Sequence, residues 1–293
     1  MKVTISQLRI LEAVARTRSF SKAAKELGIT QPSVSTQLRA LEKQSRAQLL
    51  VRNGHDIRPS RLARMALPKV RALVSLAEEV EGLLREQEAL GSGLLRVGYS
   101  TYQYAMPTIS RFMARYPGIK IEARSMASLD LLDLLDRGEI DAAFVTAQEA
   151  PEGLCSAKLF TCDIVLMLPA DHALAGRGEA DWHEIEALPL IRRERTSSTR
   201  ILFDRAAARA GVKLSTVLDL GSWGSLRAAV EAGIGGCVAL RGEVEPNDRV
   251  SVLTIRDPAL WASHFVACAS EMREVAAVDA LFREAEEVSE GCE

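Results

Sequence analysis

Apolar residues in the first part of the chain recur at helical spacing and indicate three short, consecutive helices. The first helix opens on a capping-box pattern, TISQ at residues 4–7, and then places a row of apolar residues on one face. That row consists of Leu8, Leu11 and Ala15. We expect Ser21 to cap the second helix and Thr30 to cap the third, because a hydroxyl there can accept a hydrogen bond from a first-turn N–H.

The second and third helices form a helix-turn-helix over residues Ser21 to Ala40. Ala24 leaves a small surface where the two helices cross, and Gly28 lets the chain turn where a Cβ would clash. Three apolar residues at helical spacing form the buried side of the third helix: Val34, Leu38 and Leu41. A helix pair of this shape can enter the major groove of DNA.

Small polar side chains dominate the outward face of the third helix. We expect its amide and hydroxyl groups to read base edges, and its guanidinium to contact a phosphate or a guanine. The predicted DNA-contacting residues of this helix are Gln31, Pro32, Ser33, Ser35, Thr36 and Arg39.

A small β-hairpin is predicted after the third helix. Residues 48–52 and 56–58 flank Asn53-Gly54-His55, which has the composition of a tight turn. Arg52 and Arg58 lie on either side of that turn. Such a wing can lie along the phosphate backbone or in the minor groove, so both arginines are predicted phosphate contacts.

From Ser60 the spacing changes to that of one long helix of about six turns. Its apolar stripe consists of Leu62, Ala66, Val70, Leu73, Ala77, Val80 and Leu84. Pro68 should kink this helix near its start. The stripe is longer than a 60-residue domain can cover, which favours self-association through residues 61–90. The alternative is an amphipathic helix packed on its own chain.

After Gly91-Ser92-Gly93 the pattern alternates short apolar strands with helices, which predicts a parallel α/β sheet. Helices are expected at about residues 106–116, 129–136, 199–210 and 225–232. Strands are expected at residues 94–98, 119–123, 142–145, 164–168, 217–220, 237–240, 250–255 and 265–269.

Charge is divided unevenly along the chain, although the whole chain has a net charge of −2. Residues 1–60 hold eleven Lys and Arg against four Asp and Glu, a net charge of +7. Residues 91–293 hold 21 basic against 30 acidic residues, a net charge of −9. The first part therefore suits a polyanion such as DNA, and the last part does not.

Length and composition narrow the class of protein further. A chain of 293 residues suggests about two domains. It begins with polar residues, and no apolar run approaches the ~18 residues needed to span a bilayer, so we expect a cytoplasmic protein without membrane contacts. The five cysteines lack C-x-x-C pairs, so we predict no metal site, no disulfide framework and no cofactor.

A dense pattern runs through residues 19–42. It comprises Ser19-Phe20, Ala23-Ala24, Leu27, Ile29-Thr30-Gln31-Pro32-Ser33-Val34-Ser35, Gln37-Leu38 and Leu41-Glu42. This pattern resembles the winged helix-turn-helix of LysR-type transcriptional regulators. Weaker matches follow along nearly the whole chain, at residues 48–50, 52–54, 116–118, 138–143 and 232–235. Departures at Ser45-Arg46, Arg61 and Ala63 add positive charge beside the backbone-contacting surface.

The resemblance implies an α/β protein with an N-terminal all-α winged helix-turn-helix over residues 1–60. A linker and dimerisation helix would follow over residues 61–90, and an effector-binding domain over residues 91–293. That domain would be two-lobed and similar to type II periplasmic solute-binding proteins, with the effector in the cleft. The resemblance also implies homodimers or homotetramers on pseudo-palindromic promoter DNA, with RNA polymerase as a further candidate partner.

The resemblance also divides the effector-binding domain into lobes. Lobe one would comprise about residues 92–162 and 267–293, and lobe two about residues 163–266. The crossings near Cys162-Asp163 and residues 262–266 would form the hinge.

Small hydroxyl residues cluster where the predicted strands end and helices begin. Ligands of open α/β sheets bind at these carboxyl ends, and helix N-termini there suit a carboxylate, sulfate, phosphate or phosphonate. Taken singly, such hydroxyls can also be ordinary helix caps. The predicted effector-binding residues are Ser100, Thr101, Ser128, Thr146, Thr196, Ser197, Ser198, Thr199, Ser222 and Trp223.

Residues 191–200 combine four arginines with four hydroxyls ahead of a helix. Such a segment suits a small anion held by N–H groups and one guanidinium, and the alternative is a solvated charged loop. Tyr99, Tyr102 and Tyr104 could line the cleft with Trp223. A zwitterionic effector, such as an amino acid or an aminophosphonate, could place its ammonium group on those rings.

An enzyme and a solute-binding protein are the competing functions. The four histidines are isolated and no H-E-x-x-H, G-x-S-x-G or Walker pattern occurs, so we predict no catalytic residues. A cytosolic solute-binding sensor without promoter regulation would explain residues 91–293, but not the basic helix-turn-helix. We therefore predict a sequence-specific, DNA-binding transcriptional regulator controlled by a small polar anion or zwitterion.

Overall fold

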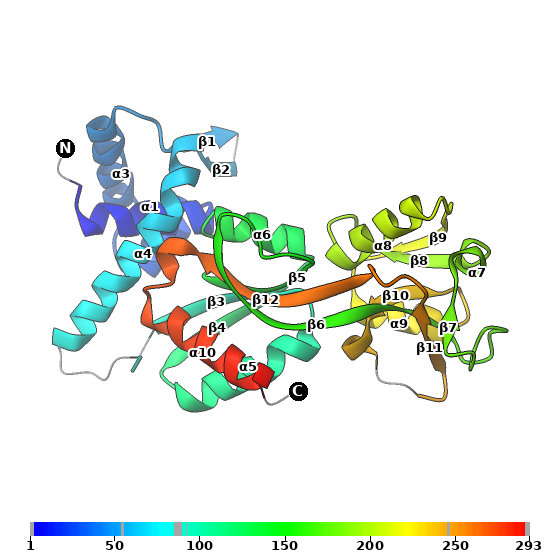
Figure 1. Ribbon diagram of the computed structural model, residues 1–293. Coiled ribbons are helices and arrows are strands. Elements are labelled where there is room, and N and C mark those ends of the chain that lie inside the picture. Colours follow the sequence, from blue (N-terminus) through cyan, green and yellow to red (C-terminus); the bar gives the residue numbers. More distant parts are fainter. Residues whose placement is uncertain (1–2, 54–55, 85–89, 92, 245–246, 291–293) are drawn as a thin grey trace.

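The computed structural model describes residues 3–53, 56–84, 90–91, 93–244 and 247–290. A helical unit and a long helix lie at one end of the molecule, and two α/β lobes follow, joined by two long strands (Figure 1). Within these described ranges, no helix is long and apolar enough to cross a membrane.

The N-terminal unit contains three helices and one antiparallel hairpin, as predicted. Its elements are α1 (Ile5–Thr17), α2 (Phe20–Glu26), α3 (Gln31–Ser45), β1 (Leu50–Asn53) and β2 (Asp56–Pro59). The capping box at Thr4 and the cap at Thr30 are confirmed. The predicted cap at Ser21 is wrong. Ser19 caps α2, because its backbone is already extended there and its Oγ accepts a hydrogen bond from Lys22 N at 3.3 Å.

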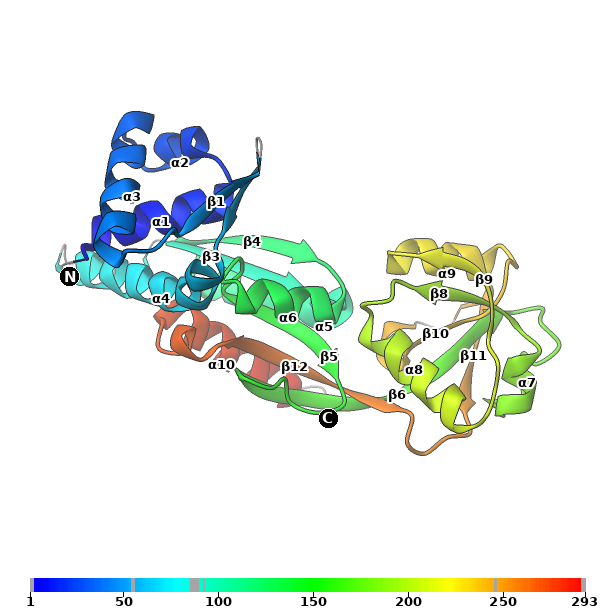
Figure 2. The same cartoon turned by 90° about the horizontal axis from the view of Figure 1, so that it is seen from above.

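Helices α2 and α3 pack against each other, with the predicted small residues at their contact and their turn (Figure 2). Ala24 is buried between the helices, and Gly28 turns the chain with φ +64°, a conformation that glycine adopts without strain. Val34, Leu38 and Leu41 are buried in the same apolar core, as predicted. Each such side chain contributes about 1.5–3 kcal/mol when fully buried, which holds α3 firmly on its support.

One long helix, α4 (Arg61–Leu84), connects the N-terminal unit to the first lobe. Part of its surface is buried on its own chain, through Ala63, Leu67, Val70 and Ala72. Among the α4 side chains that the structure describes, four large apolar ones are exposed: Leu62, Met65, Leu73 and Val80. The predicted stripe is therefore divided, with Val70 packed on its own chain and three of its larger members open to a partner.

Lobe one contains the strand order β4-β3-β5-β12-β6. Its elements are β3 (Gly93–Tyr99), α5 (Tyr102–Arg115), β4 (Ile119–Ser125), α6 (Ser128–Asp136), β5 (Ala142–Ala147), β6 (Leu154–Pro169), β12 (Trp261–Ala269), the 3-10 turn η2 (Ser270–Met272) and α10 (Ala276–Glu290). The prediction of a parallel sheet is wrong in part, because β12 runs antiparallel to β5 and β6. The chain leaves lobe one in β6 and returns in β12, so these two strands run in opposite directions.

Lobe two contains β7 (Glu179–Ala180), α7 (Trp182–Glu186), β8 (Pro189–Arg193), α8 (Ser198–Arg209), β9 (Ser215–Leu220), α9 (Trp223–Glu231), β10 (Cys237–Leu240), the 3-10 turn η1 (Arg241–Glu243) and β11 (Val250–Ile255). Strands β10 and β11 pair antiparallel with β6, and β8 pairs in parallel with β9. Strands β7 and β8 were not predicted from the sequence. In β8 the signal is hidden by Arg192 and Arg193, which are nevertheless buried.

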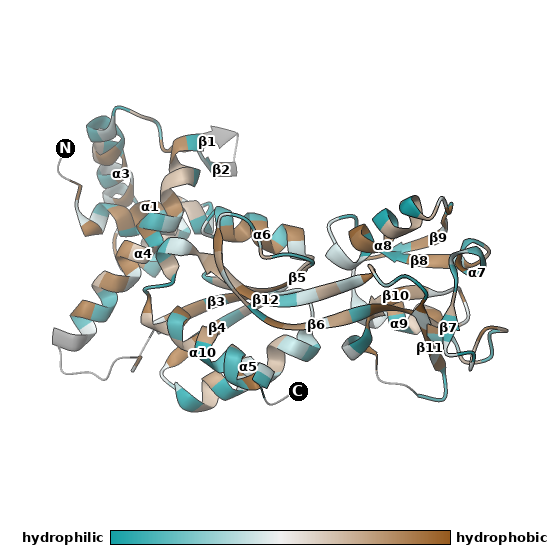
Figure 3. Cartoon of the chain, in the orientation of Figure 1, coloured by the Kyte–Doolittle hydropathy of each residue, from teal (hydrophilic) through white to brown (hydrophobic). Residues whose placement is uncertain are grey.

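Strands β6 and β12 pair with each other along the path between the lobes. Only residues 164–168 of β6 and 265–269 of β12 were predicted from the sequence. The parts of these strands nearest the junction include polar residues such as Thr161 and Asp163, which interrupt the apolar pattern. Each lobe has an apolar core of its own, and brown, hydrophobic segments occur in the strands and helices of both lobes (Figure 3). The lobes also contact each other beside the crossing strands, where the start of α6 in lobe one meets the segment before α8 in lobe two.

Candidate functional site

The outward face of α3 is polar and accessible. Four of the predicted DNA-contacting residues are exposed: Gln31, Pro32, Thr36 and Arg39. The other two on this helix, Ser33 and Ser35, are half-buried. Gln31 Nε2 donates a hydrogen bond to Ser35 Oγ at 3.2 Å, which aligns the amide with the helix face. This face presents the amide, hydroxyl and guanidinium groups that read base edges and phosphates.

A groove of about 270 Å³ lies between α3 and β1, with Ser35 and Arg39 on its α3 side. Glu42 of α3 accepts hydrogen bonds from Leu49 N at 2.8 Å and from Leu50 N at 3.2 Å. Glu42 therefore holds the hairpin against the recognition helix. This role of Glu42 was not predicted from the sequence, because its partners lie seven and eight residues further along the chain.

The hairpin carries the two predicted phosphate-contacting arginines. Arg58 is exposed on β2 and pairs in register with Val51, and the backbone of Arg52 lies in β1 opposite Ile57. The predicted turn at residues 54 and 55 lies outside the described residues. Because Glu42 ties β1 to α3, both arginines lie on strands beside the recognition helix.

A second group of predicted residues gathers where lobe one meets lobe two. The N-termini of α6 and α8 touch there, since Leu129 N donates to Thr196 O at 3.3 Å and Thr196 Oγ1 donates to Asp130 Oδ2 at 2.9 Å. The cap positions of α5, α6 and α8 make no side-chain capping hydrogen bond; these are Thr101, Ala127 and Ser197. First-turn N–H groups left without a side-chain cap can bind an anion.

We call this group the interlobe site. It is defined by Ser100, Thr101, Ser128, Thr146, Thr196, Ser197, Ser198, Thr199, Glu243 and His264. Its hydroxyls are linked around the end of β5: Thr146 N donates to Ser128 Oγ at 3.0 Å, and Thr146 Oγ1 lies 3.4 Å from Ser100 Oγ. Hydroxyls from separate strand ends therefore meet, as predicted from their positions in the sequence.

His264 of β12 adds a neutral ring to the interlobe site. Its Nδ1 lies 3.3 Å from Thr146 Oγ1, and its Nε2 has no hydrogen-bond partner in the described part of the chain. Burial lowers the pKa of His264 to about 3, so the imidazole is uncharged at neutral pH. The neutral ring can donate a hydrogen bond to a ligand or accept one from it, but it supplies no positive charge.

Glu243, a buried carboxylate of lobe two, forms hydrogen bonds with lobe one at the junction between the lobes. Glu243 accepts hydrogen bonds from Thr101 Oγ1 at 3.0 Å and Leu240 N at 2.9 Å, and Gln103 Nε2 donates to the Glu243 carbonyl at 3.0 Å. Burial raises the pKa of Glu243, an effect opposed by the Leu240 N–H and the charge of Arg193. A carboxylate next to uncapped helix N-termini makes the site suitable for a zwitterion as well as for an anion.

The arginine-rich segment 191–200 is divided between β8 and α8. Arg192 and Arg193 are buried in the strand, so the alternative of a solvated loop is wrong for them. Arg192 pairs with Asp204, and burial together with Arg200 lowers the pKa of Arg192 to about 10. Arg193 Nε has no hydrogen-bond partner among the described residues, so this guanidinium retains a free donor.

Ser222 and Trp223 lie in another part of lobe two. Ser222 Oγ caps α9, and Trp223 packs half-buried on the lobe-two core. Within the described residues, no hydrogen bond of Ser222 reaches lobe one. Tyr104, in contrast, lies at the junction, with its ring centroid 4.4 Å from that of Phe160 and 5.0 Å from that of His264.

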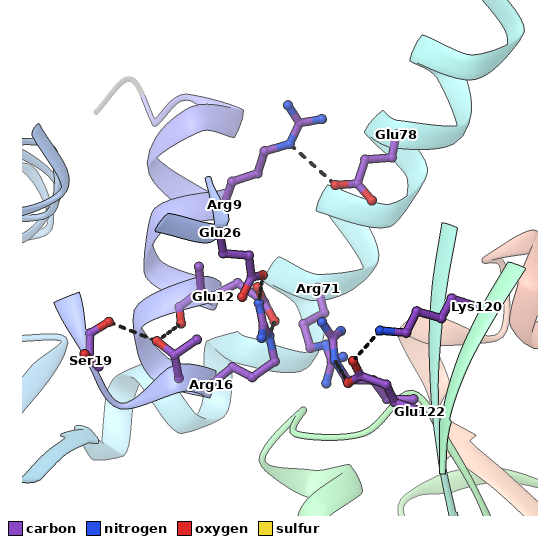
Figure 4. A network of polar contacts seen from close by, with 12 residues as sticks. Arg9, Glu12, Arg16, Ser19, Glu26, Arg71, Glu78, Lys120 and Glu122 are labelled. Carbon is purple, nitrogen blue, oxygen red and sulfur yellow. Dashed lines mark hydrogen bonds and ion pairs between the residues drawn. The ribbon is translucent and has the colours of Figure 1, made fainter. Parts of the chain in front are cut away.

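A polar network connects the N-terminal unit and α4 to lobe one (Figure 4). Arg9 of α1 pairs with Glu78 of α4 at 3.8 Å. Arg71 of α4 pairs with Asp141 of lobe one at 2.6 Å, and Arg96 N donates to the same carboxylate at 2.7 Å. Both partners of the Arg71–Asp141 pair are buried, so α4 is fixed electrostatically to the residue that precedes β5.

Two protein-family models match this chain. The model described as bacterial regulatory helix-turn-helix protein, lysR family, matches residues 5–64, and the LysR substrate binding domain matches residues 88–290. The chain belongs to the LysR family of transcriptional regulators. The predicted resemblance and fold class are thereby confirmed. In this LysR-type regulator the two matches leave residues 65–87, most of α4, between them.

This LysR-type regulator is similar along most of its length to other HTH-type regulators. It is 28% identical over 255 residues to the transcriptional regulator CbbR of Rhodospirillum rubrum, covering 86% of this chain and 85% of that protein. It is 31% identical over 249 residues to an uncharacterized HTH-type transcriptional regulator of Methanocaldococcus jannaschii, covering 80% and 81%.

Solved structures share the fold of this LysR-type regulator. Full-length OxyR from Pseudomonas aeruginosa superposes with a TM-score of 0.80 at 18% identity, covering 97% of this chain and 95% of that chain. The regulatory domain of Synechocystis PCC6803 CcmR, in complex with 2-PG, superposes with a TM-score of 0.61 at 21% identity, covering 68% and 98%. The arrangement of helix-turn-helix and two-lobed domain is therefore that of known LysR-type regulators.

Proposed function

We propose that this LysR-type regulator acts in the cytoplasm, binds promoter DNA as a homo-oligomer and responds to a small anion or zwitterion in the interlobe site. The meeting of helix N-termini that lack side-chain caps, from both lobes and around linked hydroxyls, carries the effector proposal. A ligand held by both lobes favours their closed arrangement over an open one. The outward face of α3 reads the bases, and the hairpin arginines contact phosphates.

The response reaches the DNA-binding unit through β5 and α4. Thr146 lies near the end of β5, at the proposed ligand position. The same strand begins directly after Asp141, whose carboxylate pairs with Arg71 of α4. A ligand that moves Thr146 therefore moves the partner of Arg71. Since α4 carries the N-terminal unit, the two α3 helices of a dimer change their relative placement on the promoter.

Alanine at either end of the exposed α3 face should weaken specific DNA binding. We expect Gln31→Ala and Thr36→Ala each to cost about 1–3 kcal/mol against the cognate promoter and to relax base preference at one position, because a base-edge contact is lost. Footprinting and fluorescence anisotropy on promoter variants measure this. Gln44→Ala, an exposed glutamine at the far end of α3, is the matched control. An unchanged footprint and affinity in the first two variants would contradict the assignment of α3.

Ser197→Ala tests the interlobe site with little cost to α8, because the Ser197 hydroxyl makes no capping hydrogen bond. Loss of one hydrogen bond to a charged ligand should weaken effector binding about 10- to 100-fold. A thermal-shift screen identifies the effector first, with carboxylates, amino acids, sulfur metabolites, phosphonates and 2-PG. A compound at 100 times its Kd adds about 2.7 kcal/mol of stability.

Ser110→Ala, an exposed serine on the surface of α5, is the control for this experiment and should bind the effector normally. Calorimetric titration of both variants gives the two affinities. Silence of every anion and zwitterion in the screen, or equal affinity of the two variants, would refute the interlobe proposal.

A further inference from the structure

A large cavity lies on the other face of the two crossing strands. Neighbouring residues of a strand point to opposite faces, and His264 faces Tyr104 and the interlobe site. Ser263 points the other way, where its hydroxyl lies 2.8 Å from Thr161 Oγ1. These two hydroxyls lie at the wall of a cavity of about 970 Å³, within the size range of small-molecule sites.

Both lobes contribute walls to this cavity. Residues 148–150, which follow β5, come from lobe one, and residues 254–258, which end β11 and follow it, come from lobe two. Gln148 Nε2 donates to Ala259 O at 3.1 Å and bridges the two sides. Any change in the angle between the lobes therefore changes the width of the cavity.

Most charged groups of the cavity are already paired. The pairs are Asp163 with Arg241 at 3.3 Å, Arg256 with Glu179 at 3.4 Å and Asp257 with Arg209 at 3.8 Å. Lys158 and Glu149 also line the cavity, are exposed, and form no ion pair with any described residue. One free cation and one free anion at the same cavity complement a zwitterion.

Apolar side chains also line the cavity, beside these charges and the hydroxyls of Thr161 and Ser263. Trp261, Leu260 and Phe265 line it, and Phe265 pairs in register with Lys158 on the neighbouring strand. We propose that this cavity is a second ligand site, which binds an apolar amino acid with its carboxylate on Lys158 and its ammonium on Glu149. The amino-acid side chain packs on Trp261 and Phe265. Because the walls belong to both lobes, occupancy of this site biases the same lobe angle as the interlobe site does.

Calorimetric titration of the full chain with L-phenylalanine tests the proposal. L-phenylalanine should bind, whereas phenylacetate and phenethylamine, which each lack one charge, should bind at least tenfold more weakly. Lys158→Gln and Glu149→Gln should each weaken L-phenylalanine at least tenfold. Both side chains are exposed and unpaired, so the variants should fold, which circular dichroism confirms. Glu152→Gln, an exposed glutamate in the same loop, should bind normally.

Two outcomes would overturn this second site. One is the absence of binding by both L-phenylalanine and L-leucine at millimolar concentration. The other is binding that Lys158→Gln and Glu149→Gln leave unchanged, or that Ser197→Ala reduces instead. Because the test does not use the interlobe effector, its failure leaves the proposed function intact.

Discussion

Asp141→Ala should lower the free energy of unfolding of this regulator by about 3–5 kcal/mol, the usual cost of removing one partner of a buried ion pair. The Asp141 side chain is 6% exposed and its partner, Arg71, is 3% exposed. Without the carboxylate the guanidinium remains buried, and among the described residues only the Gly138 carbonyl still accepts a hydrogen bond from it. Arg96 N also loses its acceptor. The Asp141→Ala variant therefore weakens the contact between α4 and lobe one.

Urea titration followed by circular dichroism and tryptophan fluorescence measures this loss. Asp133→Ala is the matched control, because Asp133 forms an exposed pair with Arg137 on α6 and should cost less than about 1 kcal/mol. The double variant Arg71→Met with Asp141→Asn should recover part of the loss, since no buried charge is left unpaired. Equal midpoints for Asp141→Ala and Asp133→Ala would exclude a structural role for the buried pair.

The same variants also test communication. If Asp141 transmits the state of the interlobe site to α4, the double variant should bind effector and promoter separately but lose the effect of one on the other. Promoter affinity with and without effector gives this coupling, which typically amounts to about 1–3 kcal/mol. Undiminished coupling in the double variant would show that the response follows another route.

Leu73→Asp and Val80→Asp should convert the oligomer to monomers and reduce promoter affinity at least 100-fold. Leu73 and Val80 are 49% and 53% exposed on α4, in line with exposed Leu62 and Met65. A stripe of this kind on a helix beside the DNA-binding unit is suited to pair with a second copy, and a charge buried in that interface is costly. A monomer then reaches only one half-site of a two-fold operator.

Light scattering coupled to size exclusion gives the mass, and fluorescence anisotropy gives promoter affinity. Val217→Asp is the matched control, because Val217 is 51% exposed on β9 of lobe two, far along the chain from α4. It should leave both the mass and the affinity unchanged. A full-mass oligomer in both α4 variants would rule out α4 as the interface.

The architecture of the helix-turn-helix could be predicted almost residue by residue, because its signals are local, whereas its DNA contacts stay a prediction. The cap at Thr30, the turn at Gly28 and the buried Val34 are decided by neighbours within a few residues. The one wrong cap, at Ser21, was displaced by two residues, since several serines there could fulfil the role. Glu42 was missed because its hydrogen bonds reach to the next element.

The grouping of residues at the interlobe site was predicted less completely, because strand-end hydroxyls look alike in sequence. Thr146 and Ser128 do meet, whereas Ser222 serves its own helix as a cap. His264 looked isolated, and Glu243 carried no motif at all. Buried arginines concealed strand β8, since a charged residue removes the apolar alternation that predicts a strand.

The helix-turn-helix, the long α4, the division of charge and the family follow from the sequence alone, because periodicity, capping and charge act over short stretches or add up along the chain. The antiparallel return of β12 and the assembly of the interlobe site follow only from the folded chain. The hydrogen bond between Thr101 and Glu243 joins residues 142 positions apart, and Arg71 and Asp141 meet across two structural units. Such contacts depend on how distant segments of the chain pack against each other, which no local pattern encodes.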